Sequence, residues 1–328
     1  MNEPPVVFLS RRTDQPLYET WREFLRRPIL DVNEFDRDWF PSEEVGAVVS
    51  HDAYRQETHD IFVRLIDRRI PTLILADGIL EYRNSWEQEH QSPAGIFNPV
   101  LGHKLACIGP SQCRFVESWG NAGKCENVGM PRLDDFHIPP PPSREPPLIL
   151  VCSARKPWFS EADKKLVVQS MEELQETASG LEEKGICKFV WRLTDDLQDI
   201  LGHGSRDQVP LAQDMAEAHA VISTPSTIVL EAMKSDRPVA VMDYTNSPAY
   251  VQSAWSFNHK GMISQVIADL LDPPRAKLGF QQTVLRDCLQ IDEPASPRLA
   301  RLVERMADEG ERCKSSGVPF VLPERILD

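Results

Sequence analysis

Four short apolar runs recur along the first third of the chain and constrain its fold more than any other feature. They are VVFL (6–9), GAVVS (46–50), TLILA (72–76) and KLACIG (104–109). Each run is rich in β-branched residues and is bounded by turn or polar residues, which is typical of strands buried in a parallel sheet. Between the second and third runs, Ile61, Phe62, Leu65 and Ile66 recur at helical spacing. A strand–helix–strand unit of this kind predicts a right-handed crossover and a parallel sheet.

A proline-rich segment, IPPPPSREPP (138–147), separates this region from a second one. Prolines at six of its ten positions predict a stiff, extended connector. After it the pattern repeats, with predicted strands at 148–153, 186–193, 219–224 and 237–244 and helices between them. The predicted domains are an acceptor-side lobe (1–137), the linker (138–147), a nucleotide-sugar-binding lobe (148–295) and a C-terminal helix and tail (296–328) that can pack back on the first lobe.

The alternation of strands and helices predicts an α/β fold with two Rossmann-like lobes, parallel sheets and a cleft between the lobes. In open α/β sheets, ligands bind beyond the carboxyl ends of the strands. The residues that follow each predicted strand are therefore the candidate site residues.

Charge and cysteine content narrow the class of protein. The formal charge is 36 − 50 = −14, which disfavours nucleic acid and anionic membranes as partners but still permits one phosphorylated ligand in a cleft. The seven cysteines show no CxxC spacing and no common zinc pattern, so we expect a reducing compartment and no metal site. There is no secretory-signal pattern and no run of ~18 apolar residues, which predicts a cytoplasmic protein without a transmembrane segment.

Asp77 and Gly78 follow the predicted strand 72–76. The glycine permits a sharp turn or a close approach of a ligand. The aspartate can act as a general base that takes the proton of an acceptor hydroxyl. The alternative is an aspartate that caps the next segment or forms an Asx turn.

A hydroxyl-rich segment, STPST (223–227), begins at the end of the predicted strand 219–224 and leads into a helix. Its residues Ser223, Thr224, Ser226 and Thr227 are candidate phosphate contacts, since unpaired N–H groups at a helix start attract anions. Simple capping of the helix by Ser and Thr is the alternative, and both can hold together. Glu231, within the helix, can accept hydrogen bonds from ribose hydroxyls or can merely face solvent.

Cations follow two other strands of the second lobe. Ser153 ends the predicted strand 148–153, Arg155 and Lys156 follow it, and Arg192 lies at the end of the predicted strand 186–193, next to its last residue. Basic side chains at these positions suit a nucleotide phosphate. A solvated basic turn at 155–156 is the alternative.

The acceptor-side candidates lie in the first lobe. Arg11 and Asp14 follow the first strand, and His51 and Asp52 follow the second. Tyr82 follows Asp77 and Gly78 and belongs to the same group.

Taken together, these positions resemble the GT-B glycosyltransferase superfamily. The segment VISTPSTIVLEAMKSDRPVAVMDY (221–244) is similar to the donor-binding signature of bacterial capsule and surface-polysaccharide transferases, among them CDP-glycerol glycerophosphotransferase-like and sialyl- or Kdo-transferase-like groups. The resemblance implies that Ser226 and Thr227 hold the donor phosphate and that Asp77, with Gly78, supplies the catalytic base. The His-Pro pair of the sialyltransferase-like groups is absent, and Arg192 begins the comparable segment.

The resemblance implies a metal-independent glycosyltransferase, or a glycerophosphotransferase-like enzyme, that needs no cofactor and uses a nucleotide sugar as donor. Its product would belong to surface-polysaccharide or glycoconjugate synthesis. Two alternatives stay open. One is a sugar-nucleotide 2-epimerase-like enzyme on the same fold, and the other is a binding protein of this fold that has lost catalysis.

Overall fold

The computed structural model describes residues 3–10, 19–33, 39–41, 44–51, 56–80, 97–206, 208–247 and 251–327. Arg11, Asp14, Asp52 and Tyr82, four of the acceptor-side candidates, lie outside these residues. The chain divides into two compact units. Unit 1 comprises residues 1–79, 84–135 and 287–328, and unit 2 comprises residues 80–83 and 136–286.

Unit 1 is built on a six-stranded parallel sheet in the order β2-β1-β3-β4-β5-β6. Its strands are β1 (Val6–Ser10), β2 (Ile29–Asn33), β3 (Ala47–Ser50), β4 (Thr72–Leu75), β5 (Lys104–Cys107) and β6 (Cys125–Asn127). Its helices are α1 (Gln56–Asp67), α3 (Pro110–Glu117), α10 (Ala295–Ser316) and the 3-10 turns η2 (Arg22–Phe24) and η3 (Pro131–Leu133). The four apolar runs are therefore strands, and the predicted parallel sheet is confirmed.

Unit 2 carries a five-stranded parallel sheet in the order β11-β10-β9-β7-β8. The strands are β7 (Leu148–Cys152), β8 (Lys188–Arg192), β9 (Ala220–Ser223), β10 (Val239–Met242) and β11 (Trp255–Phe257). The helices are α4 (Glu161–Glu183), α5 (Asp195–Leu201), α6 (Leu211–Glu217), α7 (Ile228–Lys234), α8 (Ile263–Leu271), α9 (Arg275–Cys288) and the turn η4 (Lys260–Met262). The second predicted α/β unit is thus also confirmed.

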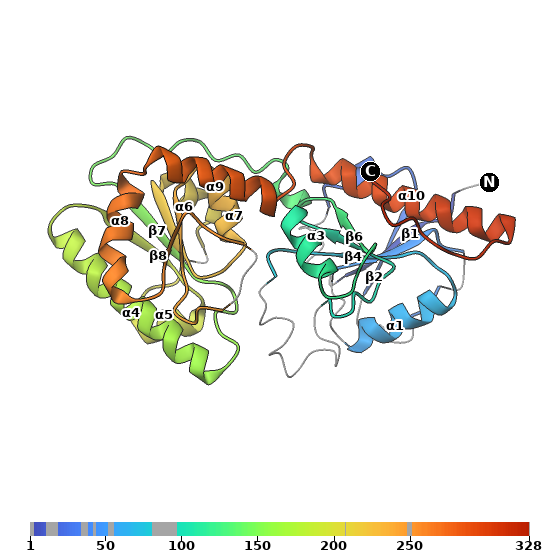
Figure 1. The fold of residues 1–328 in the computed structure, drawn as a ribbon, viewed down its shortest axis with the longest axis horizontal. Coiled ribbons are helices and arrows are strands. Elements are labelled where there is room, and N and C mark those ends of the chain that lie inside the picture. The colour runs from blue at the N-terminus through green and yellow to red at the C-terminus, as the bar shows by residue number, and fades with distance from the viewer. Residues whose placement is uncertain are drawn as a thin grey trace. The chain divides into compact units, whose positions relative to one another are not determined.

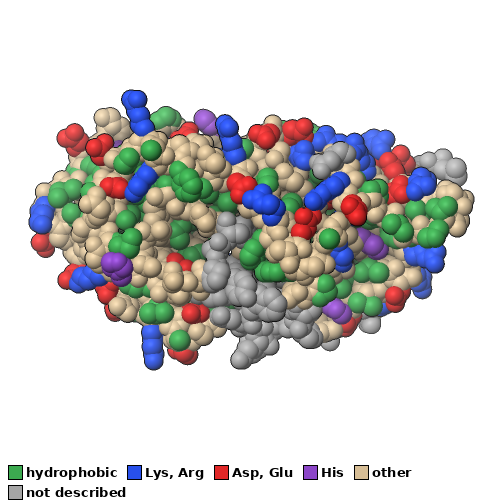
Figure 2. Space-filling view, viewed as in Figure 1, with side chains coloured by type: hydrophobic (Ala, Val, Ile, Leu, Met, Phe, Trp, Pro, Cys, Tyr) green, Lys and Arg blue, Asp and Glu red, His purple; other side chains and the backbone are tan. Residues whose placement is uncertain are grey.

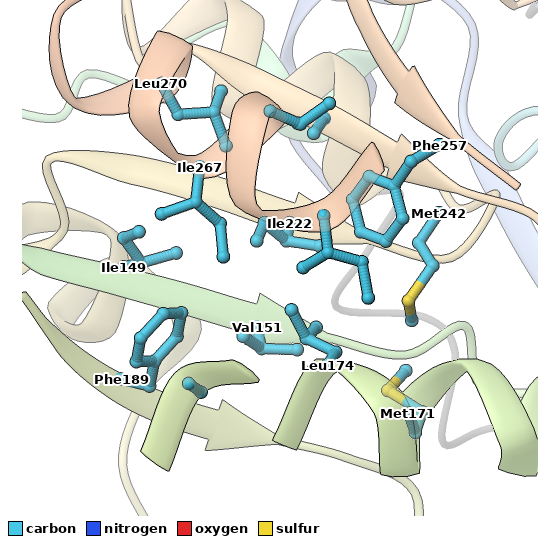
Figure 3. Packing of buried hydrophobic residues seen from close by; sticks show 14 of the residues in the cluster. Ile149, Val151, Met171, Leu174, Phe189, Ile222, Met242, Phe257, Ile267 and Leu270 are labelled. Carbon is cyan, nitrogen blue, oxygen red and sulfur yellow. The ribbon is translucent and has the colours of Figure 1, made fainter. Parts of the chain in front are cut away.

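Helices cover the sheet of unit 2 (Figure 1). Alternate strand residues such as Ile149 and Val151 enter a cluster that α4 and α8 complete. The intervening residues Leu148 and Leu150 are buried as well, so the sheet is covered on both faces. Figure 3 labels ten members of the cluster, which are Ile149, Val151, Met171, Leu174, Phe189, Ile222, Met242, Phe257, Ile267 and Leu270.

The amphipathic helix α10 packs on the sheet of unit 1 (Figure 1). Its apolar side chains Leu299, Val303 and Met306 join Val6 and Phe8 of β1 in one core cluster. The segment that leads into α10 crosses the start of α3 so closely that a Cβ on Gly109 would lie 2.3 Å from the carbonyl oxygen of Cys288. Only glycine permits this approach of two backbones.

Buried charges fix the edges of unit 1. Arg27, of which 3% is exposed, donates to Glu304, Asp308 and Glu311 of α10. On β5, the Lys104 ammonium is 2.9 Å from the Glu126 carboxylate of β6, and each residue is 1% exposed. The same carboxylate accepts the backbone N–H groups of residues 326 and 327, so this pair holds the C-terminal segment against the sheet.

Candidate functional site

The candidate donor site lies at the carboxyl edge of the unit 2 sheet. From β7 the chain passes to β8 on one side, then returns to β9 on the other side of β7. The point between β7 and β9 is therefore the topological switch point, where ligands of open α/β sheets bind. The predicted donor residues follow these two strands and β8.

Two buried hydroxyl groups connect the segments at this edge, and a third makes a local contact within the end of β9. The backbone N–H of Ala154 donates to Oγ1 of Thr224 at 2.7 Å, and that of Thr194 donates to Oγ of Ser153 at 2.9 Å. Oγ of Ser223 donates to the carbonyl oxygen of Thr224 at 2.8 Å. The first two hydroxyls hold the ends of β7, β8 and β9 together, a role in positioning the edge that the sequence pattern did not reveal.

Ser226 and Thr227 lie further along the same connection and are half-buried. Oγ of Ser226 accepts a long hydrogen bond, 3.4 Å, from the N–H of Ile228, whereas the side chain of Thr227, the residue before α7, makes no capping hydrogen bond. Glu231 is 3% exposed, so the alternative that it faces solvent is wrong. Burial raises the pKa of the Cys152 thiol, and the carboxylates of Asp214 and Glu231 raise it further while Arg192 lowers it. Glu231 therefore lies near the end of β7.

The cations at the strand ends have different surroundings. Arg155 and Lys156 are exposed, and Nζ of Lys156 lies 5.3 Å from the ring centroid of Phe159. Nη1 of Arg192 instead donates to the carbonyl of Val209 at 2.6 Å and to Asp214 at 3.2 Å. The charge of Arg192 is thus already paired within the protein, whereas those of Arg155 and Lys156 face solvent.

Asp214 was missed by the analysis of the sequence. Its carboxylate is 4% exposed and binds both Arg192 and Arg206. Asp214 lies on α6, and through Arg206 and Arg192 it links the segment before this helix to the end of β8. Nothing local distinguishes it from other acids of amphipathic helices, because its partners come from other elements.

In unit 1, Asp77 follows β4 by two residues and is exposed. The turn is held by Gln112 of α3, whose Nε2 donates to the Gly78 carbonyl at 3.1 Å and whose Oε1 accepts the N–H of Ile108 at 2.9 Å. Gln112 is fully buried and was also missed from sequence. It fixes the backbone beside Asp77.

His51 directly follows β3 and is 7% exposed. Its ring centroid lies 6.3 Å from that of Phe8 on β1. Since β2 and β3 lie on opposite sides of β1, His51 stands at the switch point of unit 1. The strands β3 and β4 are neighbours, so His51 and Asp77 follow adjacent strands at one edge of the sheet.

No three His, Cys, Asp or Glu side chains within the described residues are arranged to hold a metal ion. All seven cysteines are buried free thiols. None of the helices described is both long enough and apolar enough to cross a membrane. Figure 2 shows Lys and Arg side chains interspersed with Asp and Glu over the face in view.

No protein-family model matches the sequence, and no curated protein matches it. Solved structures do match over nearly the whole chain. One is MnaA of S. aureus in complex with UDP, with a TM-score of 0.60 and 12% identity over 98% of this chain and 99% of that chain. The fold is GT-B.

Two further matches have the same fold. The wall teichoic acid polymerase TagF, as its H444N variant with CDPG, has a TM-score of 0.57 and 10% identity over 93% of this chain and 89% of that chain. The UDP-GlcNAc 2-epimerase from Neisseria meningitidis bound to UDP-GlcNAc has a TM-score of 0.56 and 13% identity over 92% and 98%. At these low identities the structural similarity shows the fold alone, and the prediction of a GT-B architecture from the sequence is confirmed.

Proposed function

We propose that this protein transfers a group from a nucleotide-activated donor to a hydroxyl acceptor. The observation that carries the proposal is the switch point of unit 2. Hydroxyls order the ends of β7, β8 and β9 there, and Arg155 and Lys156 extend into solvent from the segment after β7. Structures of the same fold are known with UDP, CDPG and UDP-GlcNAc, which supports a nucleotide as ligand.

In the proposed reaction, Ser226, Thr227, Arg155 and Lys156 bind the donor phosphates, and Glu231 accepts the ribose hydroxyls. Asp77 takes the proton of the acceptor hydroxyl. The acceptor oxygen then forms a bond to the transferred group, while the bond between that group and the nucleotide phosphate oxygen breaks with its electron pair. Positive charge at the phosphates stabilises the departing nucleotide. No step calls for a cofactor.

Nucleotide binding is the first test. Thermal denaturation is followed with CMP, CDP, UDP, GDP and their sugars. A ligand present at 100 times its dissociation constant stabilises the folded protein by about 2.7 kcal/mol. If none of these compounds raises the melting temperature, the proposal fails.

Catalysis by Asp77 is tested with Asp77→Asn. Removing a general base lowers the rate by about 10²- to 10⁴-fold. We expect kcat for transfer to fall in this range while donor affinity stays unchanged. Asp67→Asn, an exposed acid at the end of α1 in the same unit, is the matched control and leaves kcat unchanged. Donor binding without transfer to any acceptor in the parent protein would support the non-catalytic binding protein instead.

An epimerase-like reaction is the second candidate. It is favoured by the placement of His51 and Asp77 after adjacent strands, since an epimerase needs more than one proton-transfer group near the sugar ring. Two of the matched structures are of UDP-GlcNAc 2-epimerases. Incubation with a nucleotide sugar and no acceptor separates the two candidates, because only the epimerase changes the sugar under that condition.

A further inference from the structure

A cavity of about 370 Å³ opens in unit 2 at the carboxyl ends of β10 and β11. The volume lies within the range of small-molecule sites. Its apolar part is formed by Val241, Val251, Phe257 and Met262. Its polar part consists of neutral side chains and one acid. They are Asp243, Asn246, Ser247, Gln252, Ser253, Ser256 and Asn258.

The described residues that line the cavity carry negative charge and no positive charge. Asp243 is the single charged side chain among its described lining residues, and none of them is Lys, Arg or His. Lys260, two residues past the lining residue Asn258, is held by the carboxylate of Glu176 on α4 at 2.5 Å. An anionic ligand in this cavity would therefore meet a carboxylate with no cation to offset it, and we expect it to be repelled.

The carboxylate of Asp243 is positioned to receive a hydroxyl. Its backbone N–H donates to the carbonyl of Phe257 at 3.1 Å, which ties the ends of β10 and β11 together. Oδ1 accepts the N–H and the hydroxyl of Thr245 at 3.0 and 2.5 Å. Within the ranges that the structure describes, Oδ2 has no protein donor. A carboxylate oxygen in this state is a strong acceptor for a ligand O–H group.

The amides of the cavity complement this acceptor. Asn246, Gln252 and Asn258 are exposed, and the described contacts leave their side-chain amides unoccupied. An amide offers both donors and an acceptor, as a sugar hydroxyl does. Ser253, by contrast, already donates to the carbonyl of Val239. Apolar side chains beside neutral hydrogen-bonding groups fit a ring with C–H faces and peripheral hydroxyls.

We propose that this cavity binds an uncharged, hydroxyl-rich ring, and that this ring is the sugar carried by the nucleotide donor. The inference rests on the proposed function. Neighbouring strands are about 4.8 Å apart, so the ends of β10 and β11 lie roughly 10 Å from the switch point between β7 and β9. The proposal places the donor phosphates at the switch point and the sugar at the ends of β10 and β11. The donor sugar is accordingly neutral, and uronic acids and glycerol phosphate are excluded as the transferred group.

Calorimetric titration of the full chain tests this inference. The ligands are the bare nucleoside diphosphates UDP, CDP and GDP and, for the base that binds, the glucose and galactose derivatives with their uronic acid counterparts. Each pair differs only at C6, where a carboxylate replaces a hydroxymethyl group. We expect at least one neutral sugar to bind more tightly than the bare nucleotide, and its uronic acid to bind at least tenfold more weakly than the neutral sugar.

Two variants locate the effect in the cavity. Asp243→Asn keeps an acceptor for Thr245 and removes the charge, so the gain from the neutral sugar falls about tenfold while binding of the bare nucleotide is unchanged. Asp199→Asn, an exposed acid on α5, is the control and has no effect. Asn258→Lys supplies a cation and shifts the preference toward the uronic acid.

The outcomes separate the two proposals. If no nucleotide binds, the proposed function is overturned and this inference with it. If nucleotides bind but the uronic acid binds as tightly as the neutral sugar, or Asp243→Asn leaves the sugar contribution intact, only the inference is overturned.

Discussion

The sheets of unit 1 and unit 2 wind in the same way: in each, the second strand lies on one side of the first and the third strand on the other. Their carboxyl edges differ in chemistry. At the switch point of unit 2, hydroxyls and exposed cations follow the strands, whereas unit 1 presents a buried imidazole and, after the next strand, an exposed carboxylate. The proposed function assigns a different task to each edge of this shared topology, since phosphate binding needs donors and proton transfer needs titratable groups.

The units also differ in how buried charge stabilises them. Lys104 and Glu126 of unit 1 are both fully buried, whereas Asp214 of unit 2 is buried but pairs with arginines whose side chains are 24% and 35% exposed. Removing one residue of a fully buried ion pair leaves the charge of the other residue buried and without its counter-charge. Arginines that are partly exposed can instead be hydrated when their carboxylate partner is removed.

The largest expected effect follows from this contrast. Glu126→Ala leaves two backbone N–H groups without their acceptor and leaves the Lys104 ammonium with two carbonyl acceptors but no counter-charge. We expect unit 1 to lose about 3–5 kcal/mol of stability. Asp214→Ala costs unit 2 about 1–2 kcal/mol. Urea denaturation, followed by hydrogen exchange of the backbone amides of each sheet separately, measures the loss of stability in both units. Equal losses in the two units would contradict the expected difference between their buried charges.

A smaller effect is expected from pH in unit 1. Burial, with the nearby Lys124 charge, lowers the pKa of His103 to about 4. Between this value and about 6.5, the unfolded chain binds a proton at His103 and the folded chain does not, so stability falls as the pH falls through this window. We expect about 2–3 kcal/mol to be lost between pH 7 and pH 4 from this group.

The variant His103→Asn isolates that contribution. Its amide oxygen can accept the N–H of Thr72 in place of Nδ1, so the variant keeps the contact and removes the titration. Denaturation at pH 4 and pH 7 should show a reduced pH dependence. An unchanged pH dependence in His103→Asn would refute the assignment.

The smallest effect concerns the donor edge of unit 2. The double variant Arg155→Ala, Lys156→Ala removes the two exposed cations after β7, and we expect nucleotide affinity to fall about tenfold. The double variant Lys184→Ala, Lys188→Ala removes the same charge at the opposite end of the sheet, beside the start of β8, and leaves affinity unchanged. Calorimetric titration with the nucleotide that binds best compares them. Equal losses would show a general charge effect and no local phosphate contact.

Two strands escaped prediction for a physical reason. Strand β2 lies at a sheet edge with its middle residues exposed, and β11 has three residues, so neither carries the long apolar run of a central strand. The helices α3, α5 and α9 were missed as well. The candidate residues were partly sorted by the structure: Ser153, Ser223 and Thr224 order the edge, Arg192 is paired within the protein, and Arg155 and Lys156 are open to a ligand.

From its sequence alone this chain determined two parallel α/β units, because the spacing of apolar residues along the backbone records which positions are buried. It also placed hydroxyl, acidic and basic residues directly after the strands. Only the tertiary structure decided which strands are neighbours, which charges are already paired and where a cavity forms. The reason is that such choices depend on residues far apart in the chain, such as Arg27 with Glu304 and Gly109 with Cys288, and no local pattern encodes them.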